Sequence, residues 1–253
     1  MNLKALDHAE LLDKSVNNLL DDFGAGHSAP GSGSAAALMG ILSGKLILTV
    51  CKLSLQKAQE ERRDIDAGLV KKSDLRYIPI EDRLNYIVDD ITNNIEPNLK
   101  KLFADDSKEF EQVVELRKKR NRAKASGNKE FESKFNIESL DKLQLVTGYV
   151  FTVADECFKL IKHGNYIFDN AYNAVRGDSG ASISAAIAGI TTSIFIINLN
   201  LVSLSRRNWS KTKKLECDEL YELLQKTQLD AFTRVGALSA EVMDTMQLNL
   251  EQF

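Results

Sequence analysis

A turn rich in glycine and serine leads directly into an apolar helix in the first part of the chain. Pro30 fixes its own φ angle, and Gly31 and Gly33 allow the backbone to come close to a ligand. The hydroxyl of Ser32 or Ser34 could cap the free amides of the first helical turn. Such a helix start can bind an anion or a polar substrate, and it is equally typical of a loop before a buried helix.

Four polar side chains further along the chain could also take part in chemistry. Asp178 stands just before an apolar segment, where a carboxylate either caps a helix or acts as an acid/base group. Lys57 follows the apolar helix and either complements the helix dipole in solvent or binds a carboxylate. Asp106 lies in a charged run, where a surface carboxylate is the simpler interpretation. Asn198 places an amide in an apolar helix, so a neighbouring helix or a ligand must supply its hydrogen-bond partners.

Several short blocks of the sequence carry a family resemblance through their order and spacing. These blocks are Pro30-Gly31-Ser32-Gly33-Ser34, Leu53-Ser54-Leu55-Gln56-Lys57, Ala104-Asp105-Asp106-Ser107-Lys108-Glu109-Phe110, Asn173-Ala174-Val175-Arg176-Gly177-Asp178 and Ile197-Asn198-Leu199. Together they resemble the cyclodeaminase/cyclohydrolase family of folate one-carbon enzymes over roughly residues 7–205. The resemblance implies an all-α fold and no cofactor beyond a tetrahydrofolate derivative as the substrate.

The resemblance also implies roles for particular residues. Catalysis would fall to Asp178, Lys57 and Asp106, and substrate binding to Ser28, Pro30, Gly31, Ser32, Gly33, Ser34 and Asn198. The reaction would be hydrolysis of 5,10-methenyltetrahydrofolate to 10-formyltetrahydrofolate, or formation of the methenyl compound from 5-formiminotetrahydrofolate with release of ammonia. Hydrolysis is slightly preferred, because it requires no formiminotransferase partner.

The chain departs from the family pattern at several places. Ser32 stands where a glycine is usual, Ile194 stands where many members have asparagine, and the segment Thr147-Gly148-Tyr149-Val150 has no proline. These departures indicate a divergent member. Two alternatives therefore stay open: a folate-binding or scaffold protein of the same fold without catalysis, and an enzyme of this fold that acts on a substrate other than folate.

The composition restricts the partners of the protein. The 253 residues have a formal net charge of −3, which argues against nucleic acid as the main partner. The three cysteines are widely spaced and favour a reducing cytoplasm over a disulfide framework. None of the three histidines forms a metal-binding motif with them, so no metal site is expected. A small-molecule folate is the expected partner.

The apolar spacing predicts one all-α domain over residues 1–253, built as a bundle of about seven helices. Helices are expected at 6–23, 34–57, from Pro79 onward with a kink or break at Pro97, and at 137–162, 179–205 and 218–248. Residues 59–78 are expected to separate two helices, and Ser126-Gly127-Asn128 to form an exposed turn.

Two of these helices are apolar on nearly all sides and are expected at the centre of the bundle. The segment between Asp178 and Arg206 has no charged residue, but its many hydroxyl and amide side chains favour a protein core over a membrane span. Gly40-x-x-x-Gly44 and Ala181-x-x-x-Ala185-x-x-x-Gly189 place small residues one turn apart. This spacing suits two central helices packed on each other or on a symmetry mate, and we expect a homodimer.

Overall fold

The structure, a computed structural model, describes residues 8–71 and 74–250, and the regular structure in those ranges is entirely helical. The all-α class is therefore confirmed. The α-helices in the described ranges are α1 (Val16–Gly24), α2 (Ser32–Asp66), α3 (Glu81–Asp90), α4 (Glu96–Ala125), α5 (Lys129–Asn170), α6 (Arg176–Ser203) and α7 (Asn208–Leu250). Short 3-10 helices lie at His8–Asp13, Ile78–Ile80 and Asn173–Val175, and a π-helical segment lies at Ile91–Ile95.

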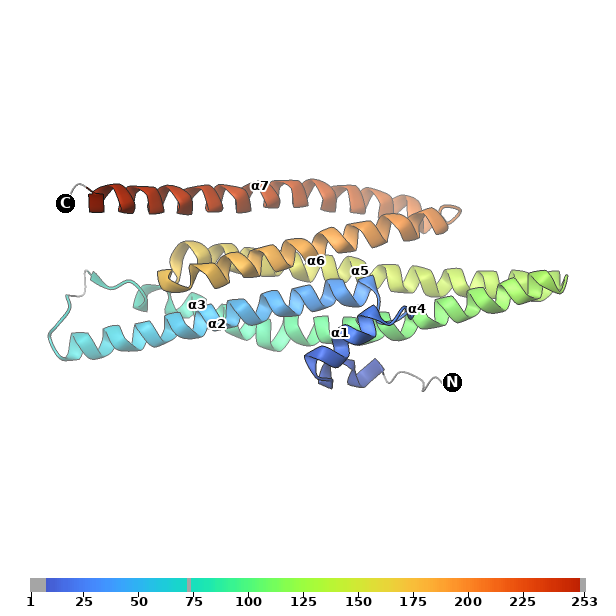
Figure 1. The fold of residues 1–253 in the computed structure, drawn as a ribbon, viewed down its shortest axis with the longest axis horizontal. Coiled ribbons are helices and arrows are strands. Elements are labelled where there is room, and N and C mark those ends of the chain that lie inside the picture. Colours follow the sequence, from blue (N-terminus) through green and yellow to red (C-terminus); the bar gives the residue numbers. More distant parts are fainter. Residues whose placement is uncertain (1–7, 72–73, 251–253) are drawn as a thin grey trace.

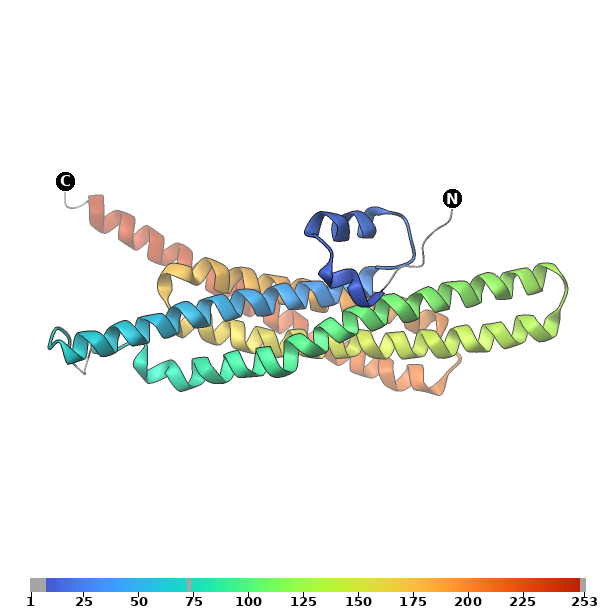
Figure 2. The same ribbon diagram turned by 90° about the horizontal axis from the view of Figure 1, so that it is seen from below.

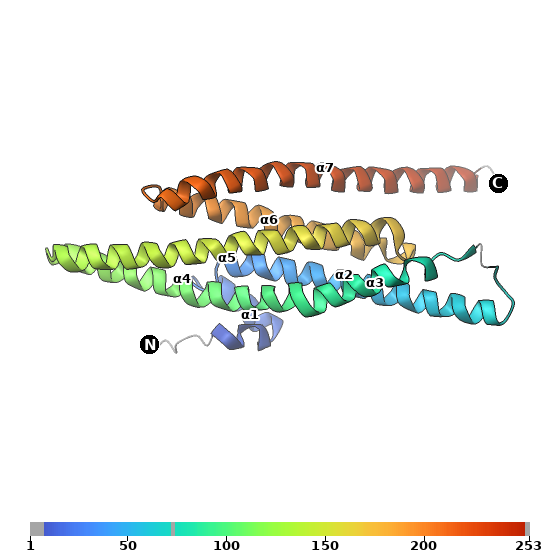
Figure 3. The same cartoon turned by 180° about the vertical axis from the view of Figure 1, so that it is seen from behind.

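The helices form an elongated bundle with α2 and α6 beside each other near its middle (Figure 1). They run in opposite directions. Helix α5 packs against α6 and α2, and α4 packs against α5 and α2 (Figures 1 and 3). The turn between α4 and α5 lies at one end of the long axis, and the last part of α7 lies toward the other end. Both apolar helices thus pack near the middle of the bundle, but one face of α6 is exposed, contrary to the expectation that it is buried on nearly all sides.

Helix α2 extends further than the sequence predicts. It continues to Asp66, so the assignment of residues 59–78 to a separating segment is wrong for its first part. The polar side chains of this extension form ion pairs at the surface: Lys57 with Glu60 at 2.6 Å, and Arg62 with Glu81 at the start of α3. A charged helical face in solvent needs no apolar residues, and the hydrophobic pattern therefore ends before the helix does.

The expected first helix is two helices. Ser15 interrupts it and caps α1, because its hydroxyl accepts a hydrogen bond from the amide of Asn18 at 3.3 Å. Residues 6 and 7 of that prediction lie outside the described residues. The 3-10 helix, α1 and the following loop form a hook beside the start of α2 and against α4 (Figure 2).

Pro97 does not break the chain into two helices. The π-helical segment Ile91–Ile95 directly precedes it, and Pro97 falls in the first turn of α4. A π-helical turn changes the hydrogen-bond pattern, so α3 continues into α4 without a gap in sequence. The turn at Ser126–Asn128 is confirmed, with Gly127 at a φ of +73°.

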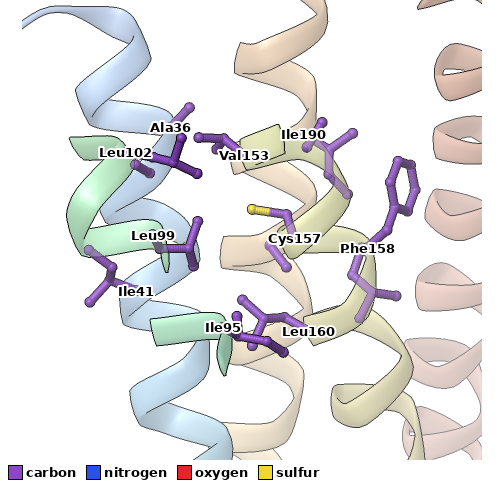
Figure 4. Close-up of a cluster of buried hydrophobic side chains, with 14 of the residues drawn as sticks. Ala36, Ile41, Ile95, Leu99, Leu102, Val153, Cys157, Phe158, Leu160 and Ile190 are labelled. Atoms are coloured by element: carbon purple, nitrogen blue, oxygen red, sulfur yellow. The ribbon is translucent and has the colours of Figure 1, made fainter. Parts of the chain in front are cut away.

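The centre of the bundle depends on small residues that face a buried cysteine. Gly40 of α2 and Gly189 of α6 both point at Cys157 of α5, and Figure 4 shows Cys157 among the surrounding Leu, Ile and Val side chains. A Cβ atom at position 189 would lie 2.8 Å from Cys157 Sγ and 3.1 Å from the carbonyl oxygen of Ala36. Helices α2, α5 and α6 therefore approach one another more closely at this level than side chains with a Cβ would allow.

Both central helices are long and apolar enough to cross a membrane by length and composition. In α2 the most apolar window is 56% buried within the bundle, and in the segment Asn173–Ser203 the corresponding share is 39%. The second value shows that much of the uncharged surface of α6 has no neighbour within one chain.

Candidate active site

The glycine-serine turn and Asp106 meet at the start of α2. Asp106 lies on α4 and is only 6% exposed, and its Oδ2 accepts a hydrogen bond from the hydroxyl of Ser34 at 3.0 Å. The backbone amide of Ser34 also donates to this carboxylate, so Asp106 caps the first turn of α2 from a different helix. The prediction of a surface carboxylate at position 106 is therefore wrong.

Burial changes the proton affinity of this carboxyl group. Removal from water raises the pKa of Asp106 to about 6, while the hydrogen bonds from Ser34 act in the opposite direction. A carboxyl group with a pKa near 6 can both accept and return a proton at neutral pH, which is the property required of a general acid/base.

Gly33 makes this contact sterically possible. A Cβ atom at position 33 would lie 2.6 Å from Asp106 Cγ, so glycine leaves the space that the carboxylate occupies. The sequence suggested that Gly33 admits a ligand; in the structure it admits the Asp106 side chain. Glycine is required here for the close approach of two elements, and its φ angle is ordinary.

The serine hydroxyls do not cap α2 as expected. Gly31 occupies the N-cap position in an extended conformation, and no side chain makes a capping hydrogen bond from it. Ser32 points to solvent, and Ser34 faces α4, where its hydroxyl donates to Asp106 and to the carbonyl oxygen of Phe103. Pro30 is buried, follows a cis peptide bond and fixes the entry of the chain into α2.

The loop before α2 contributes the remaining predicted binding residue of this region. Ser28 is half-buried, and its carbonyl oxygen lies 3.3 Å from the position of a Cβ atom at Gly31. The hook covers the adjacent part of α4, where the Phe23 ring packs edge-to-face on Phe103 with centroids 6.4 Å apart. Asp106 therefore lies between the start of α2, its own helix and a loop that precedes it in sequence.

Lys57 belongs to a different part of the molecule. It is 23 residues after Ser34 on the same helix, and at a rise of about 1.5 Å per residue the two are roughly 35 Å apart. Lys57 Nζ forms an ion pair with Glu60 and lies 5.2 Å from the centroid of the Tyr172 ring. The hydrogen bond to Glu60 raises the pKa of Lys57. Lys57 and Asp106 of one chain cannot act on the same atom of a small substrate.

Asp178 lies toward the Lys57 end of the bundle. Helix α6 begins at Arg176 with Val175 as its N-cap, so Asp178 is inside the first turn and the prediction that it stands before the helix as a cap is wrong. The amide of Tyr172, six residues earlier, donates to the hydroxyl of Ser54 on α2 at 3.0 Å. The Asp178 carboxylate is half-buried and is placed where the positive end of the helix dipole favours a negative charge.

Asn198 has its hydrogen-bond partners within the protein. Its side-chain amide donates to the carbonyl oxygen of Ile194 at 2.9 Å and to Cys217 Sγ at 3.4 Å, so it faces α7. Ile194, which replaces an asparagine of the family pattern, is buried and 8% exposed. The side-chain amide thus donates to a carbonyl of its own helix and to a cysteine of α7, and among the described residues no hydrogen bond to the backbone of a neighbouring helix is involved.

The helical spacing of the residues before Asp106 could have predicted that its side chain is buried. The charged residues around it favoured a surface position instead. Leu99, Leu102 and Phe103 are buried, and Asp106 continues their face of α4 at helical spacing. No comparable pattern in the sequence predicts that the Tyr172 ring lies beside Lys57, because this contact joins two segments that are distant in the sequence. Within the described residues, no group of three His, Cys, Asp or Glu side chains is arranged to hold a metal ion.

Comparisons with known proteins agree with this architecture. The family model described as formiminotransferase-cyclodeaminase matches residues 15–219, so the chain belongs to that family. A methenyltetrahydrofolate cyclohydrolase from Methylorubrum extorquens is 19% identical over 238 residues, which cover 93% of this chain and 97% of the relative. The crystal structure of a formiminotetrahydrofolate cyclodeaminase from Thermotoga maritima has the same fold, with a TM-score of 0.66 and 16% identity over 92% of this chain and 100% of that one.

Proposed function

We propose that this protein is a cytoplasmic one-carbon folate enzyme that hydrolyses 5,10-methenyltetrahydrofolate to 10-formyltetrahydrofolate. Family membership supports the substrate class, and the relative from Methylorubrum extorquens supports the direction. The observation that carries the proposal is the buried Asp106 carboxyl group, held by Ser34 at the start of α2 with a pKa of about 6.

The hydrolysis needs one group that accepts a proton and then returns it. A water oxygen attacks the methenyl carbon of the cationic ring, and Asp106 takes a proton from that water. The tetrahedral intermediate then loses its bond between this carbon and N5, and N5 receives the proton from Asp106. The second proton of the water leaves to solvent, and the formyl group stays on N10. Base catalysis of this kind contributes about 10²- to 10⁴-fold to a rate.

The direct experiment follows the near-ultraviolet absorbance of 5,10-methenyltetrahydrofolate after addition of the purified chain. We expect the absorbance to fall faster than in buffer alone. Release of ammonia from 5-formiminotetrahydrofolate, without hydrolysis, would assign the cyclodeaminase reaction instead. Saturable binding of folate by calorimetry without either product would support a binding or scaffold protein, and no binding at all would indicate a different substrate.

Replacement of Asp178 by asparagine tests the carboxylate at the other end of the bundle. We expect the loss of turnover to be smaller than that caused by the same change at Asp106, because Asp178 is only half-buried and lies toward the other end of the bundle. The melting temperature is expected to fall only slightly, since one charge at a helix start contributes about 0.3–1 kcal/mol. The turnover numbers of Asp178→Asn and Asp106→Asn, both measured at saturating substrate, test this expectation. Complete inactivation by Asp178→Asn with full activity of Asp106→Asn would reverse the two roles.

Lys57→Met is expected to leave the turnover number within about threefold of the unchanged protein. The lysine is separated from Asp106 by most of α2, and its ion pair with Glu60 is exposed, so stability should change little. Steady-state rates over a range of substrate concentrations check this. A rise in KM alone would show that Lys57 holds a distant part of the substrate, and a large fall in the turnover number would contradict a site centred on Asp106 of the same chain.

A further inference from the structure

The hairpin formed by the end of α4 and the start of α5 is strongly basic. Residues 115–134 contain eight lysines and arginines and three glutamates, a net charge of +5, so the rest of the chain has a net charge of −8. Figures 1 and 2 show this hairpin extending past the turn between α6 and α7. The slightly acidic charge of the whole chain therefore conceals a basic end that projects from an acidic remainder.

The positive charge of the hairpin is only partly compensated. Lys118 forms an ion pair with Glu115 at 2.6 Å. Arg120 instead donates to the side-chain oxygen of Asn121 at 3.0 Å and to that of Asn136 at 3.3 Å. Because an amide oxygen has no net charge, these two contacts orient the guanidinium group without neutralising it. The hairpin is therefore expected to attract anions.

A groove along the side of the hairpin combines two cations with two aromatic rings. It lies between α4 and α5, has a volume of about 490 Å³, and its lining includes Lys119, Arg122, Phe131 and Phe135. The two rings stack with their centroids 5.9 Å apart and an angle of 19° between their planes, and Phe131 is 47% exposed. None of the described residues that line this groove has a carboxylate.

The other grooves of the hairpin contain acidic side chains. The groove that contains Lys124 and Lys129 also contains Glu132. The groove nearer the bundle contains Glu115 and Glu138. A carboxylate repels an anionic ligand, so the groove with the two rings is the most favourable place on the hairpin for a ligand that has both negative charge and a planar ring.

We propose that the groove lined by Lys119, Arg122, Phe131 and Phe135 binds a single-stranded segment of nucleic acid. A base stacks on the exposed Phe131 ring, and the adjacent phosphates contact Lys119 and Arg122. Arginine suits phosphate because its planar fork donates two parallel hydrogen bonds. Stacking on an aromatic side chain tolerates every base, so the site has little sequence preference. The proposal does not depend on the reaction that the protein catalyses.

The position of Phe131 favours a nucleic-acid strand over a membrane or an acidic peptide. The ring lies in a groove between two helices, so a flat bilayer that meets the end of the hairpin does not reach it. An acidic peptide pairs with the cations but has no planar group to stack on the ring. A single strand supplies a phosphate and a base in every repeat, and its bases are not already paired as they are in a duplex.

Binding of fluorescent probes about eight nucleotides long to the full chain tests the proposal. We expect oligo(U) and oligo(dT) to bind at low salt and to weaken as salt rises, with a slope of log K against log salt of about −1.4 for two phosphate contacts. The first probe represents RNA and the second DNA, and binding of either supports the proposal. Binding of neither, or equally tight binding of an acidic peptide of the same charge or of phosphatidylserine vesicles, would overturn it.

An abasic strand of the same length separates stacking from charge. Phe131→Leu should weaken the binding of oligo(dT) by about fivefold or more and change the binding of the abasic strand by less than about twofold, because only a base stacks on the ring. Arg122→Gln should weaken both. Ile137→Ala on α5 and Lys101→Gln on α4, at exposed positions outside the groove, are the controls and should change neither. Equal effects of Phe131→Leu on the two probes would contradict the proposal.

Phe131→Trp reports the stacking directly. Its emission should be quenched by oligo(dT) and not by the abasic strand, because quenching requires a base on the ring. Trp209 is the single natural tryptophan and is half-buried, so emission of the natural chain provides the background and should not change. Unchanged emission from Phe131→Trp while oligo(dT) is bound would place the strand elsewhere and overturn the proposal.

Discussion

Replacement of Asp106 by asparagine is expected to lower turnover by about 100-fold or more and, at the same time, to raise the melting temperature at pH 7. The loss of activity follows because asparagine cannot accept a proton from the attacking water. Asparagine keeps the size of aspartate, and its side-chain oxygen can still accept the hydrogen bond from Ser34. The cap on α2 therefore survives while the acid/base function is lost.

The gain in stability follows from the raised pKa of Asp106. In the folded protein this pKa is about 6, above the value of 3.8 that the group has in an unfolded chain, so the folded state holds the proton more tightly. The resulting stability is fully present below about pH 4 and is lost as the pH rises through 6. A difference of about two pKa units corresponds to roughly 3 kcal/mol, which asparagine would recover at pH 7.

Thermal unfolding at two pH values checks this prediction. At pH 7 the Asp106→Asn protein should melt about 6–12 °C higher than the unchanged protein, and at pH 4 the two should melt together. Asp105→Asn is a matched control, because its half-buried side chain is the next one on α4, and it should change neither activity nor stability in this way. A less stable Asp106→Asn protein at pH 7 would show that the charge of Asp106 holds α2 in place.

The second large effect is expected at the centre of the bundle. Gly189→Leu should lower the free energy of unfolding by about 3 kcal/mol or more. A side chain at this position meets Cys157 Sγ at 2.8 Å and the carbonyl oxygen of Ala36 at 3.1 Å. The sulfur can shift, but the backbone of α2 cannot do so without separating α2 from α6. Helix α6 packs on α2, and the start of α2 carries Ser34, which holds Asp106, so activity should fall together with stability.

Urea unfolding of two glycine variants in α6 measures this effect. Gly180→Leu is the control, because the nearest atom to a Cβ at that position is 4.0 Å away, on the Phe168 ring. We expect that variant to stay within about 1 kcal/mol of the unchanged protein. Similar midpoints for Gly189→Leu and Gly180→Leu would contradict the close approach of α2 and α6.

The sequence predicts the fold more fully than it predicts the site. Helical periodicity and the near absence of proline indicate an all-α chain, because the apolar faces of the helices are local patterns. The end of α2 at Asp66 was not predictable in the same way, since ion pairs such as that of Arg62 with Glu81 join segments that are separate in sequence. Hydrophobic spacing contains no information about such pairs.

The candidate site shows the same limit more clearly. The motif residues Lys57, Asp106 and Asp178 resemble one family signature, yet the structure places Asp106 beside Ser34 and Lys57 about 35 Å along the same helix. A motif gives the order of residues along the chain, and only the packing of α2 against α4 decides which of them meet. The small residues of α6 illustrate this too: Gly189 faces α2, while Ala181 faces outward.

The pH dependence of methenyltetrahydrofolate hydrolysis tests the central claim most directly. Asp106 must be ionised to accept a proton, and its pKa is about 6. We therefore expect the enzymatic rate, corrected for the rate in buffer, to fall about tenfold per pH unit below pH 6 and to be constant above pH 6. In Asp106→Asn this fall of the rate below pH 6 should be absent. An unchanged rate and the same fall below pH 6 in Asp106→Asn would contradict the assignment of the proton transfer to Asp106.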